Sequence, residues 1–310
     1  MTDIPQSPLC ADSLVVLEDE ISGEALSAEW KRQLGVEIPS AFSNQPLFRL
    51  WRCTRSQLRF ITPSMPGCGD FYAKLRAFDW YYSAEKWEYE RALRWVQKDQ
   101  RLLDVGCGDG AFIQMAAAKG AVSEGLELNP SAVAHAQGKG LRVWARLSNE
   151  HAQEPDFEPY DLVSAFQVLE HVDDPLAFLR SLIALVKPGG KLIIGVPNCD
   201  GWGGSTGGVL QWPPHHLTWW GSAPLVYLQQ VLPLRLINLE YEPLRVSHQR
   251  DRISALLFPS VAPKPATCGI LGRIRKRLLC EMTMRLTPSR ADGHTVLAVY
   301  ERMEVDAVRP

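Results

Sequence analysis

The sequence predicts a doubly wound α/β fold, in which a mostly parallel sheet carries helices on both faces. Two observations predict it. Between residues 98 and 243, short apolar segments alternate with helical patterns, and such alternation builds βαβ units. Within that region a strand runs directly into Gly106, Gly108 and Gly110 and then into a helix. A small N-terminal module and a helical C-terminal insertion complete the predicted architecture.

The elements of the α/β core follow one another in a regular order. Strands are expected at residues 101–105, 124–128, 141–145, 161–166, 191–196, 234–242 and 294–301, and helices at 111–119, 130–137, 174–186 and 223–231. Two helices have clear start signals, because Asn129 precedes Pro130 and Asp174 precedes Pro175. A side-chain acceptor at the N-cap and a proline at the first helical position both favour a helix start.

The rest of the chain has a different pattern. We expect a small module at residues 1–70, an aromatic helical segment at 71–97 and the α/β domain at 98–310, with a helical insertion at 244–293. Prolines interrupt the first of these regions, which is expected to be irregular apart from short strands near 14–17 and 58–61. In the second, Trp80, Trp87 and Trp95 recur at a spacing that places them along one face of a helix.

Composition and charge exclude several classes of protein. The 33 basic and 35 acidic side chains leave a net charge of −2, whereas a nucleic-acid-binding protein usually has a basic excess. No apolar run approaches the ~20 residues that span a bilayer, and the first residues do not resemble a signal peptide. The seven cysteines include no C-x-x-C pair, which favours a reducing compartment. We expect a cytoplasmic protein that acts on a small molecule.

The glycine-rich turn is the most informative segment. Glycines at 106, 108 and 110 let the backbone bring its N–H groups and a helix N-terminus against a ligand. Glu127 lies at the end of the next predicted strand, where an acid accepts both hydroxyls of a ribose. The spacing also fits a dinucleotide site. Asp104 and Asp109 separate the two interpretations, because their charge repels a pyrophosphate and attracts a cationic ligand.

These residues resemble a known family. The segment from Asp104 to Gly110 resembles motif I (D-x-G-x-G-x-G) of the class I S-adenosylmethionine-dependent methyltransferases, and the turn at 187–190 resembles their L-x-P-G-G turn. The resemblance covers about residues 98–200 and implies a Rossmann-like, seven-stranded sheet with S-adenosylmethionine as the cofactor. It implies cofactor-binding roles for eight positions: Asp104 and Gly106 against the methionine part, Gly108 and Gly110 in the turn that holds the cofactor, Glu127 on the ribose, Leu128 on the adenine, and Phe166 and Gln167 near the methionine and the methyl group.

A polar segment, Gln167 to His171, follows the fourth predicted strand. It resembles the Glu-x-x-Glu-His segment of quinone-pathway O-methyltransferases, which is associated with a divalent metal. Here Gln167 replaces the first acid, which weakens the case for an ion of the Mg²⁺ type. We therefore expect no metal, and we favour the interpretation that Glu170 and His171 orient the loop through hydrogen bonds to the backbone. His171 is kept as a candidate catalytic residue.

A second cluster lies at residues 211–220, where aromatic and proline residues surround His215 and His216. An imidazole with an ordinary pKa of about 6.5 suits a general base, and a similar P-P-H-H run borders the substrate pocket in a bacterial subset of these methyltransferases. One histidine of such a pair is often only packed. The glycine-rich residues 201–208 before this cluster are expected to form either a mobile lid or a plain linker.

Two flanking features complete the prediction. Cys10 and Cys53 resemble the first ligands of zinc-ribbon knuckles, but serines stand at the second positions, 13 and 56, so a metal-free relic is expected. The basic segment from Arg273 to Arg290 has helical periodicity, which indicates either a solvated face or peripheral contact with an anionic partner or membrane surface.

The sequence thus predicts methyl transfer from S-adenosylmethionine to a small molecule, at an O or N atom more readily than at C. Specialised metabolism or surface saccharide synthesis is the expected setting, by analogy with the family alone. Two alternatives stay open, an NAD(P)-dependent oxidoreductase and a non-catalytic cofactor-binding partner subunit. Seven of the ten tryptophans flank the proposed pocket in the sequence, where aromatic faces exclude water and attract a sulfonium.

Overall fold

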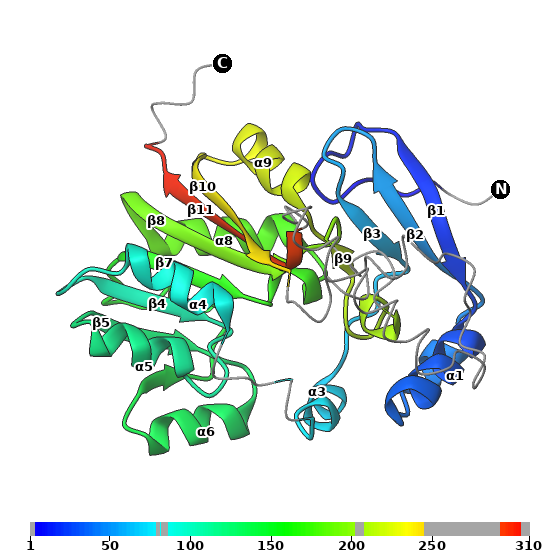
Figure 1. Cartoon of the computed structure of the whole chain (residues 1–310), viewed down its shortest axis with the longest axis horizontal. Helices are drawn as coiled ribbons and strands as arrows, with labels where there is room; N and C mark the ends of the chain where they lie inside the picture. Colours follow the sequence, from blue (N-terminus) through cyan, green and yellow to red (C-terminus); the bar gives the residue numbers. More distant parts are fainter. Residues whose placement is uncertain (1–3, 79–80, 82–85, 202–207, 245–291, 305–310) are drawn as a thin grey trace, which may run out of the picture.

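The computed structural model describes residues 4–78, 81, 86–201, 208–244 and 292–304. Its main sheet has seven strands in the order β10-β11-β8-β7-β4-β5-β6 (Figure 1). The strands are β4 (Arg101–Val105), β5 (Val122–Leu126), β6 (Arg142–Trp144), β7 (Tyr160–Phe166), β8 (Val186–Pro197), β10 (Leu234–Pro243) and β11 (Asp292–Arg302). Strands β4 to β8 are parallel, and β11 pairs antiparallel with both β8 and β10. The predicted doubly wound, Rossmann-like architecture is confirmed.

Neighbouring residues of each central strand bury their side chains on opposite faces of this sheet. Leu103 packs with the helices α8 (Pro175–Leu185) and α9 (Ser222–Val231), whereas Leu102 packs with α4 (Trp87–Ala92) and α5 (Ala111–Ala118). A strand buried on both faces reads as a continuous apolar run, because it has no solvent-facing side. The predicted helix starts are also confirmed: Asn129 caps α6 (Pro130–Gly138) and Asp174 caps α8 through their side-chain oxygens.

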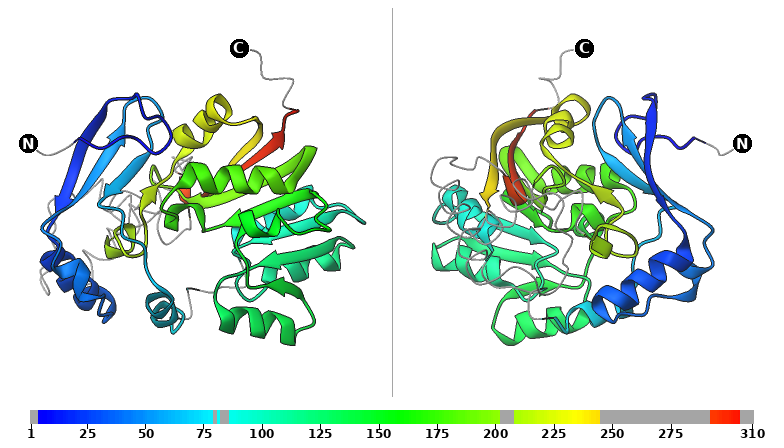
Figure 2. Two further views of the ribbon diagram at one scale, coloured as in Figure 1. Left: turned by 180° about the vertical axis from the view of Figure 1, so that it is seen from behind. Right: turned by 45° about the vertical axis from the view of Figure 1, so that its right-hand side comes forward.

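The N-terminal residues form a second sheet, which lies to one side of the main sheet (Figures 1 and 2). Its antiparallel strand order is β1-β2-β3-β9, with β1 at Val15–Ile21, β2 at Phe48–Cys53, β3 at Arg59–Thr62 and β9 at Thr218–Trp219. Strand β9 belongs to the histidine-rich segment at 211–220, so residues far apart in the sequence complete one sheet. The pairing of β3 with β9 helps to position the segment that carries His215 and His216.

The expectation that residues 1–70 are irregular was wrong. Besides the expected short strands, the structure contains β2, a short helix α2 (Ser40–Ser43) and the twelve-residue helix α1 (Gly23–Leu34). Ser22 caps α1 by accepting the N–H of Ala25, and Gly35 ends it with a φ of +66°. These are ordinary helix start and stop signals. They lie between Pro8 and Pro39, where the sequence contains no proline.

The expectation of one helical segment at 71–97 was also wrong. Within the described residues it consists of α3 (Gly69–Leu75), α4 and the short 3₁₀ helix η1 (Leu93–Trp95). Phe71 packs with Trp30 of the N-terminal module, whereas Tyr89 packs against the main sheet. One straight helix does not reach both cores, so packing overrides the local periodicity. Trp80 lies outside the described residues, as do 202–207 of the glycine-rich segment and the basic segment 273–290.

Most strand bounds differ from the expectation by one or two residues, and two strands differ in ways that bear on the site or on a predicted turn. Strand β5 begins and ends two residues before the predicted strand, so Glu127 and Leu128 lie in the loop beyond it. Strand β8 begins at Val186 and includes the turn at 187–190, because Val186 already pairs with Tyr160 of β7. The other helices near the main sheet are α7 (Ser148–His151) and η2 (Leu169–His171), whereas η3 (Gly208–Gln211) packs against α1 of the N-terminal module.

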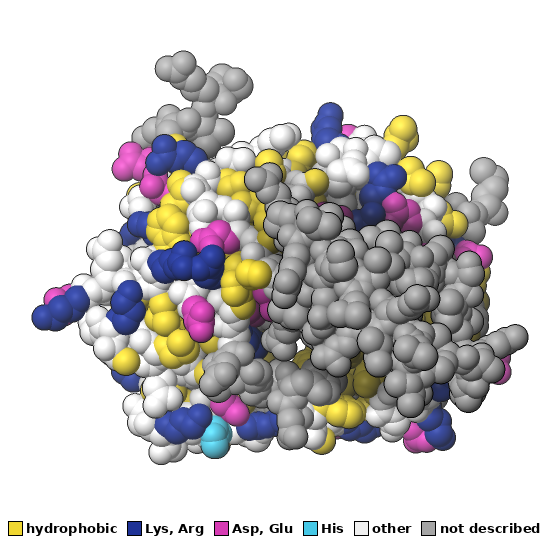
Figure 3. Space-filling view, in the orientation of Figure 1, with side chains coloured by type: hydrophobic (Ala, Val, Ile, Leu, Met, Phe, Trp, Pro, Cys, Tyr) yellow, Lys and Arg dark blue, Asp and Glu magenta, His cyan; other side chains and the backbone are white. Residues whose placement is uncertain are grey.

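The surface carries charges of both signs. On the face drawn in Figure 3, the Lys and Arg side chains of the described residues are interspersed with acidic and apolar ones. Among the described helices, none combines the length and the apolar character needed to cross a bilayer.

Candidate functional site

The glycine-rich turn has the predicted strand-turn-helix form. All three glycines have positive φ values, +75° at Gly106, +54° at Gly108 and +81° at Gly110, which favour glycine over any other residue. A Cβ atom added at Gly106 would lie 2.4 Å from Cγ2 of Val168, in the loop after β7. The turn therefore depends on glycine for its conformation and for the close approach of the neighbouring loop.

Glu127 lies directly beside this turn. Its carboxylate accepts the N–H of Gly108 at 2.9 Å and the N–H of Asn129 at 2.8 Å. The next residue, Leu128, leaves 60% of its surface exposed. A carboxylate held at a glycine-rich turn by backbone N–H groups, and followed by an exposed apolar side chain, suits the hydroxyls of a ribose and the face of a flat base.

Asp104 and Asp109 contribute less free negative charge than expected. Asp104 is buried in β4, where the Ser164 hydroxyl donates to it at 2.7 Å. Burial raises the pKa of Asp104 to about 7, even though the hydrogen bond from Ser164 lowers it. Asp109 pairs with Arg76 of the segment after α3 at 2.9 Å. Asp104 and Asp109 therefore repel a pyrophosphate less strongly in the structure than the sequence indicates.

Phe166 ends β7 beside the turn, and Gln167 is the first residue after the strand. Phe166 packs against Phe112 of α5 and Tyr89 of α4, with ring centroids 4.8 Å and 5.1 Å away. Gln167 has a φ of +56°, a sparsely populated conformation for a residue with a side chain. Its amide donates to Glu88 of α4 at 3.2 Å. Strain of this kind gathers at functional sites.

Glu88 is a site residue that the sequence reasoning missed. It is 4% exposed, and burial raises its pKa. A Cβ at Gly195 of β8 would lie 3.6 Å from its Cβ, so Glu88 sits over the sheet. The signal in the sequence was an acid on an aromatic helix, but its burial depends on how α4 docks.

The three candidate histidines come together although the sequence separates them. Ring centroids lie 4.6 Å apart for His171 and His215, 5.0 Å for His171 and His216, and 4.3 Å for His215 and His216. Tyr72 and Trp30 of the N-terminal region pack around His215, at 6.4 Å each. Residues of η2 and of the segment before β9 thus form one buried cluster.

Burial keeps these imidazoles neutral. It lowers the pKa of His171 to about 4, although the bond to the carbonyl oxygen of His215 raises it, and it lowers the pKa values of His215 and His216 well below the ordinary value. The neighbouring Glu170 is 1% exposed, and burial raises its pKa to about 8. The low dielectric disfavours every charged form in this cluster.

The N-terminal module fixes the segment that carries His215 and His216. The indole of Trp30 donates to the carbonyl oxygen of Pro213 at 2.9 Å, and the N–H of Gly67 donates to that of Pro214 at 2.9 Å. On the other side, the N–H of Leu217 donates to the backbone carbonyl of Glu170 at 2.9 Å. Sequence reasoning did not predict this role for the N-terminal module.

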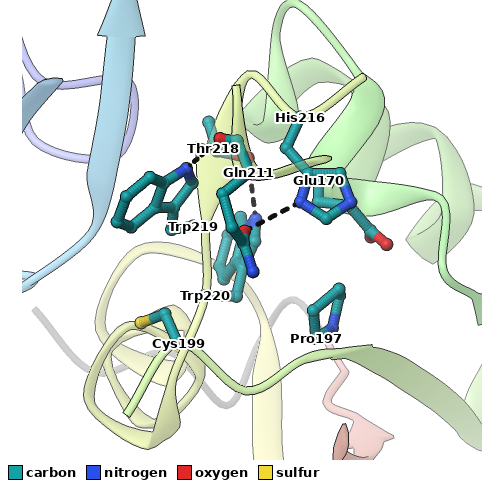
Figure 4. A pocket seen from close by; sticks show the side chains of 8 residues that line it. All are labelled: Glu170, Pro197, Cys199, Gln211, His216, Thr218, Trp219 and Trp220. Atoms are coloured by element: carbon teal, nitrogen blue, oxygen red, sulfur yellow. Dashed lines mark hydrogen bonds between the residues drawn. The ribbon is translucent and has the colours of Figure 1, made fainter. Parts of the chain in front are cut away.

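A narrow pocket reaches the cluster from the side of β8 (Figure 4). Its wall consists of Glu170, Pro197, Cys199, Gln211, His216, Thr218, Trp219 and Trp220. In Figure 4, Gln211 lies beside His216, and its Oε1 accepts from Nδ1 of that ring at 2.9 Å. The pocket therefore has an aromatic wall and a polar wall.

The four knuckle positions of the N-terminal module are close together. The N–H of Ser56 donates to Sγ of Cys53 at 3.4 Å, and Arg55 donates to Sγ of Cys10 at 3.5 Å. Burial raises the pKa of Cys53, but hydrogen bonds from three serine hydroxyls, among them those of Ser13 and Ser56, outweigh it and bring the pKa to about 7. The prediction of a metal-free relic stays a prediction.

Comparisons with known proteins give the class of this domain. Residues 82–230 match the family model described as Methyltransferase domain. The chain is 37% identical over 105 residues to the ubiquinone biosynthesis O-methyltransferase of Vibrio vulnificus and 41% identical over 106 residues to that of Aeromonas salmonicida. Each match covers 32% of this chain and 44% of the relative. The chain thus spans less than half the length of the curated relatives that it matches.

A solved structure agrees in fold. A chain in the complex between the Haloferax volcanii Trm112 methyltransferase activator and a methyltransferase superposes with a TM-score of 0.50 and 16% identity, over 77% of this chain and 98% of that one. Together with the strand order and the glycine turn, the matches show that the chain contains a class I S-adenosylmethionine-dependent methyltransferase domain. The cofactor of this class is S-adenosylmethionine. Of the two interpretations of the glycine turn, the matches favour this one over a dinucleotide site.

Proposed function

We propose that the protein transfers a methyl group from S-adenosylmethionine to an oxygen or nitrogen atom of a small-molecule acceptor. The observation that carries the proposal is the juxtaposition of two features at one edge of the sheet. The glycine turn with Glu127 follows β4 and β5, and the histidine cluster with Glu170 lies beyond β7. Parallel strands end at the same edge, where open α/β sheets bind ligands.

The cofactor side consists of residues on β4, β5 and their loops. Gly106, Gly108 and Gly110 present backbone to the methionine part, with Asp104 beneath them in the sheet. Glu127 binds the ribose hydroxyls through the carboxylate that here accepts backbone N–H groups. Leu128 supplies the exposed apolar surface for the adenine.

The methyl side consists of Phe166 and Gln167. Phe166 ends β7 beside the turn, and Gln167, the next residue, also contacts Glu88. S-adenosylmethionine supplies the methyl group on a sulfonium, and the transfer is a direct displacement that needs an in-line acceptor and the exclusion of water. The buried aromatic groups Tyr89 and Phe112 close this side against solvent.

The acceptor side consists of the histidine cluster. In His171 and His215 the Nδ1 atom lies at hydrogen-bond distance from a backbone carbonyl, so Nε2 carries the lone pair. A neutral imidazole with a fixed lone pair accepts a hydrogen bond from an acceptor hydroxyl or amine and receives its proton. Because the histidine pKa values are low, each ring is a weak base that stays neutral at physiological pH.

The proposal is tested in two stages. Isothermal titration with S-adenosylhomocysteine should show binding, and NAD should not compete with it. Incubation with methyl-labelled cofactor and a small-molecule extract should then place label in a product. Hydroxylated acceptors are tested first, because the named relatives are O-methyltransferases. Acceptors from specialised metabolism and surface saccharide synthesis follow.

A non-catalytic, cofactor-binding partner subunit is the second candidate. Gln167 in place of an acid and the buried position of the His215 ring favour it. Binding of S-adenosylhomocysteine without label in any product of a producing extract would support this candidate over the enzyme.

A further inference from the structure

The three histidines present ring nitrogens to one another. One ligand atom from each of His171, His215 and His216 lies within 4.8 Å of the others. The Nδ1 atom of each ring faces an oxygen, at 2.6 Å from the carbonyl of His215, 3.0 Å from the carbonyl of Leu210 and 2.9 Å from Oε1 of Gln211. Carbonyl oxygens only accept, so the proton sits on Nδ1 and the lone pair is left on Nε2.

The hydrogen bonds at Nδ1 are of the kind that metal-binding histidines make, whereas the rings of His215 and His216 are stacked with 20° between their planes and must turn for both to face one ion. A ligating imidazole usually donates its other N–H to a carbonyl or carboxylate, which fixes the tautomer and the orientation of the ring. Zinc–nitrogen bonds of about 2.0 to 2.1 Å place tetrahedral ligands about 3.3 Å apart. The furthest pair of ligand atoms therefore needs to close by roughly 1.5 Å, a movement that rotation of side chains supplies.

Buried groups around the cluster lack partners. Neither carboxyl oxygen of Glu170 has a hydrogen-bond partner within the described part of the chain, and the same holds for Nε2 of His215. Glu170 is 1% exposed, and its Oε1 lies 3.6 Å from Nε2 of His171. A buried polar group without a partner costs free energy, and a buried carboxylate costs more. One divalent cation among the rings satisfies the ring nitrogens and supplies the countercharge of Glu170.

We propose that His171, His215 and His216 bind a divalent transition-metal ion such as Zn²⁺, with the Glu170 carboxylate as the adjacent negative charge. Three imidazole nitrogens favour Zn²⁺ over Mg²⁺, which prefers oxygen ligands. Glu170 and His216 also line the narrow pocket in Figure 4, so the cluster borders it. The proposal departs from the sequence expectation of no metal. An ion on Nε2 would occupy the lone pairs to which the proposed function gives the acceptor's proton, so in the metal-bound protein these rings do not act as bases. Metal binding itself does not depend on methyl transfer, and the two proposals are therefore tested separately.

The test uses the full-length protein after removal of metal with a chelator. Titration with Co²⁺ should give one equivalent of binding with the intense visible d–d absorption of a four-coordinate site, and Zn²⁺ should displace it. His216→Gln should weaken Co²⁺ binding by roughly 100-fold or more. His135→Gln, the same change at an exposed position on α6, should leave it unchanged. Circular dichroism checks that both variants fold.

Three results would overturn the proposal. The first is a folded, metal-free wild-type protein that binds neither Co²⁺ nor Zn²⁺. The second is a thiolate-to-cobalt charge-transfer band that disappears in a Cys10→Ser/Cys53→Ser variant, because the ion would then sit in the N-terminal module. The third is equal competition by Mg²⁺. Binding of S-adenosylhomocysteine is measured on the same samples, and its loss would count against the proposed function alone.

Discussion

Glu127 offers the sharpest test of the cofactor site. Its carboxylate accepts two backbone N–H groups, from Gly108 at 2.9 Å and Asn129 at 2.8 Å, and in the proposed complex it binds the ribose hydroxyls. Hydrogen bonds to a charged group that is partly buried are worth about 1 to 3 kcal/mol. The Glu127→Ala variant should therefore raise the dissociation constant of S-adenosylhomocysteine about 5- to 150-fold.

The assay is isothermal titration, and Asp161→Ala is the matched control. Asp161 also accepts a backbone N–H, that of Arg101 at 2.9 Å, but it lies at the opposite edge of the sheet, where β4 and β7 begin. The control should lose some thermal stability and keep its affinity for S-adenosylhomocysteine. If the dissociation constant of S-adenosylhomocysteine for Glu127→Ala is within twofold of the wild-type value, or if Asp161→Ala loses affinity equally, the ribose site has been misplaced.

Three further predictions concern the turn and the histidine segment. Burial raises the pKa of Asp104 from 3.8 to about 7, so the folded state binds this proton more tightly than the unfolded one, and the contribution of Asp104 to stability falls as pH rises from about 4 to 7. The difference in urea midpoint between the wild type and Asp104→Asn should therefore shift against the wild type over this range, and a difference that does not change with pH would contradict the raised pKa. Gly106→Ala should lose about 1 to 2 kcal/mol for its φ of +75° alone. A further loss from contact with Val168 should be recovered in the double variant with Val168→Ala, as measured by urea unfolding, and equal stability of the wild type and Gly106→Ala would contradict the close approach. Trp30→Phe removes the bond to the carbonyl of Pro213, so it should cost about 0.5 to 1.5 kcal/mol and slow methyl transfer without changing cofactor affinity; a parallel loss of affinity would argue against a role limited to the histidine segment.

Local signals predicted the cofactor half of the site. A strand, three glycines and a helix follow one another within eleven residues, from Leu102 to Phe112. The turn between the strand and the helix depends only on the local backbone conformation. The caps at Asn129 and Asp174 are equally local, and they place their helices to within a residue. Helix α1 was missed although Ser22 and Gly35 mark its ends, because weight was given to prolines that lie outside it.

The acceptor half depends on contacts that no local pattern contains. The sequence singled out the His215–His216 pair and His171 separately, but η2 and the segment before β9 meet through tertiary contacts, such as the bond from the N–H of Leu217 to the carbonyl oxygen of Glu170. The pairing of Phe60 with Thr218 also depends on tertiary contacts, and so does the burial of Glu88 between α4 and the main sheet. Such contacts follow from tertiary packing, which also divided the predicted helix at 71–97.

A crystal structure with S-adenosylhomocysteine tests the central claim most directly. The account predicts the ribose on the Glu127 carboxylate, the adenine against Leu128 and the thioether sulfur directed past Gln167 toward the histidine cluster. A ligand bound elsewhere, or one whose sulfur points away from His171, His215 and His216, would contradict it.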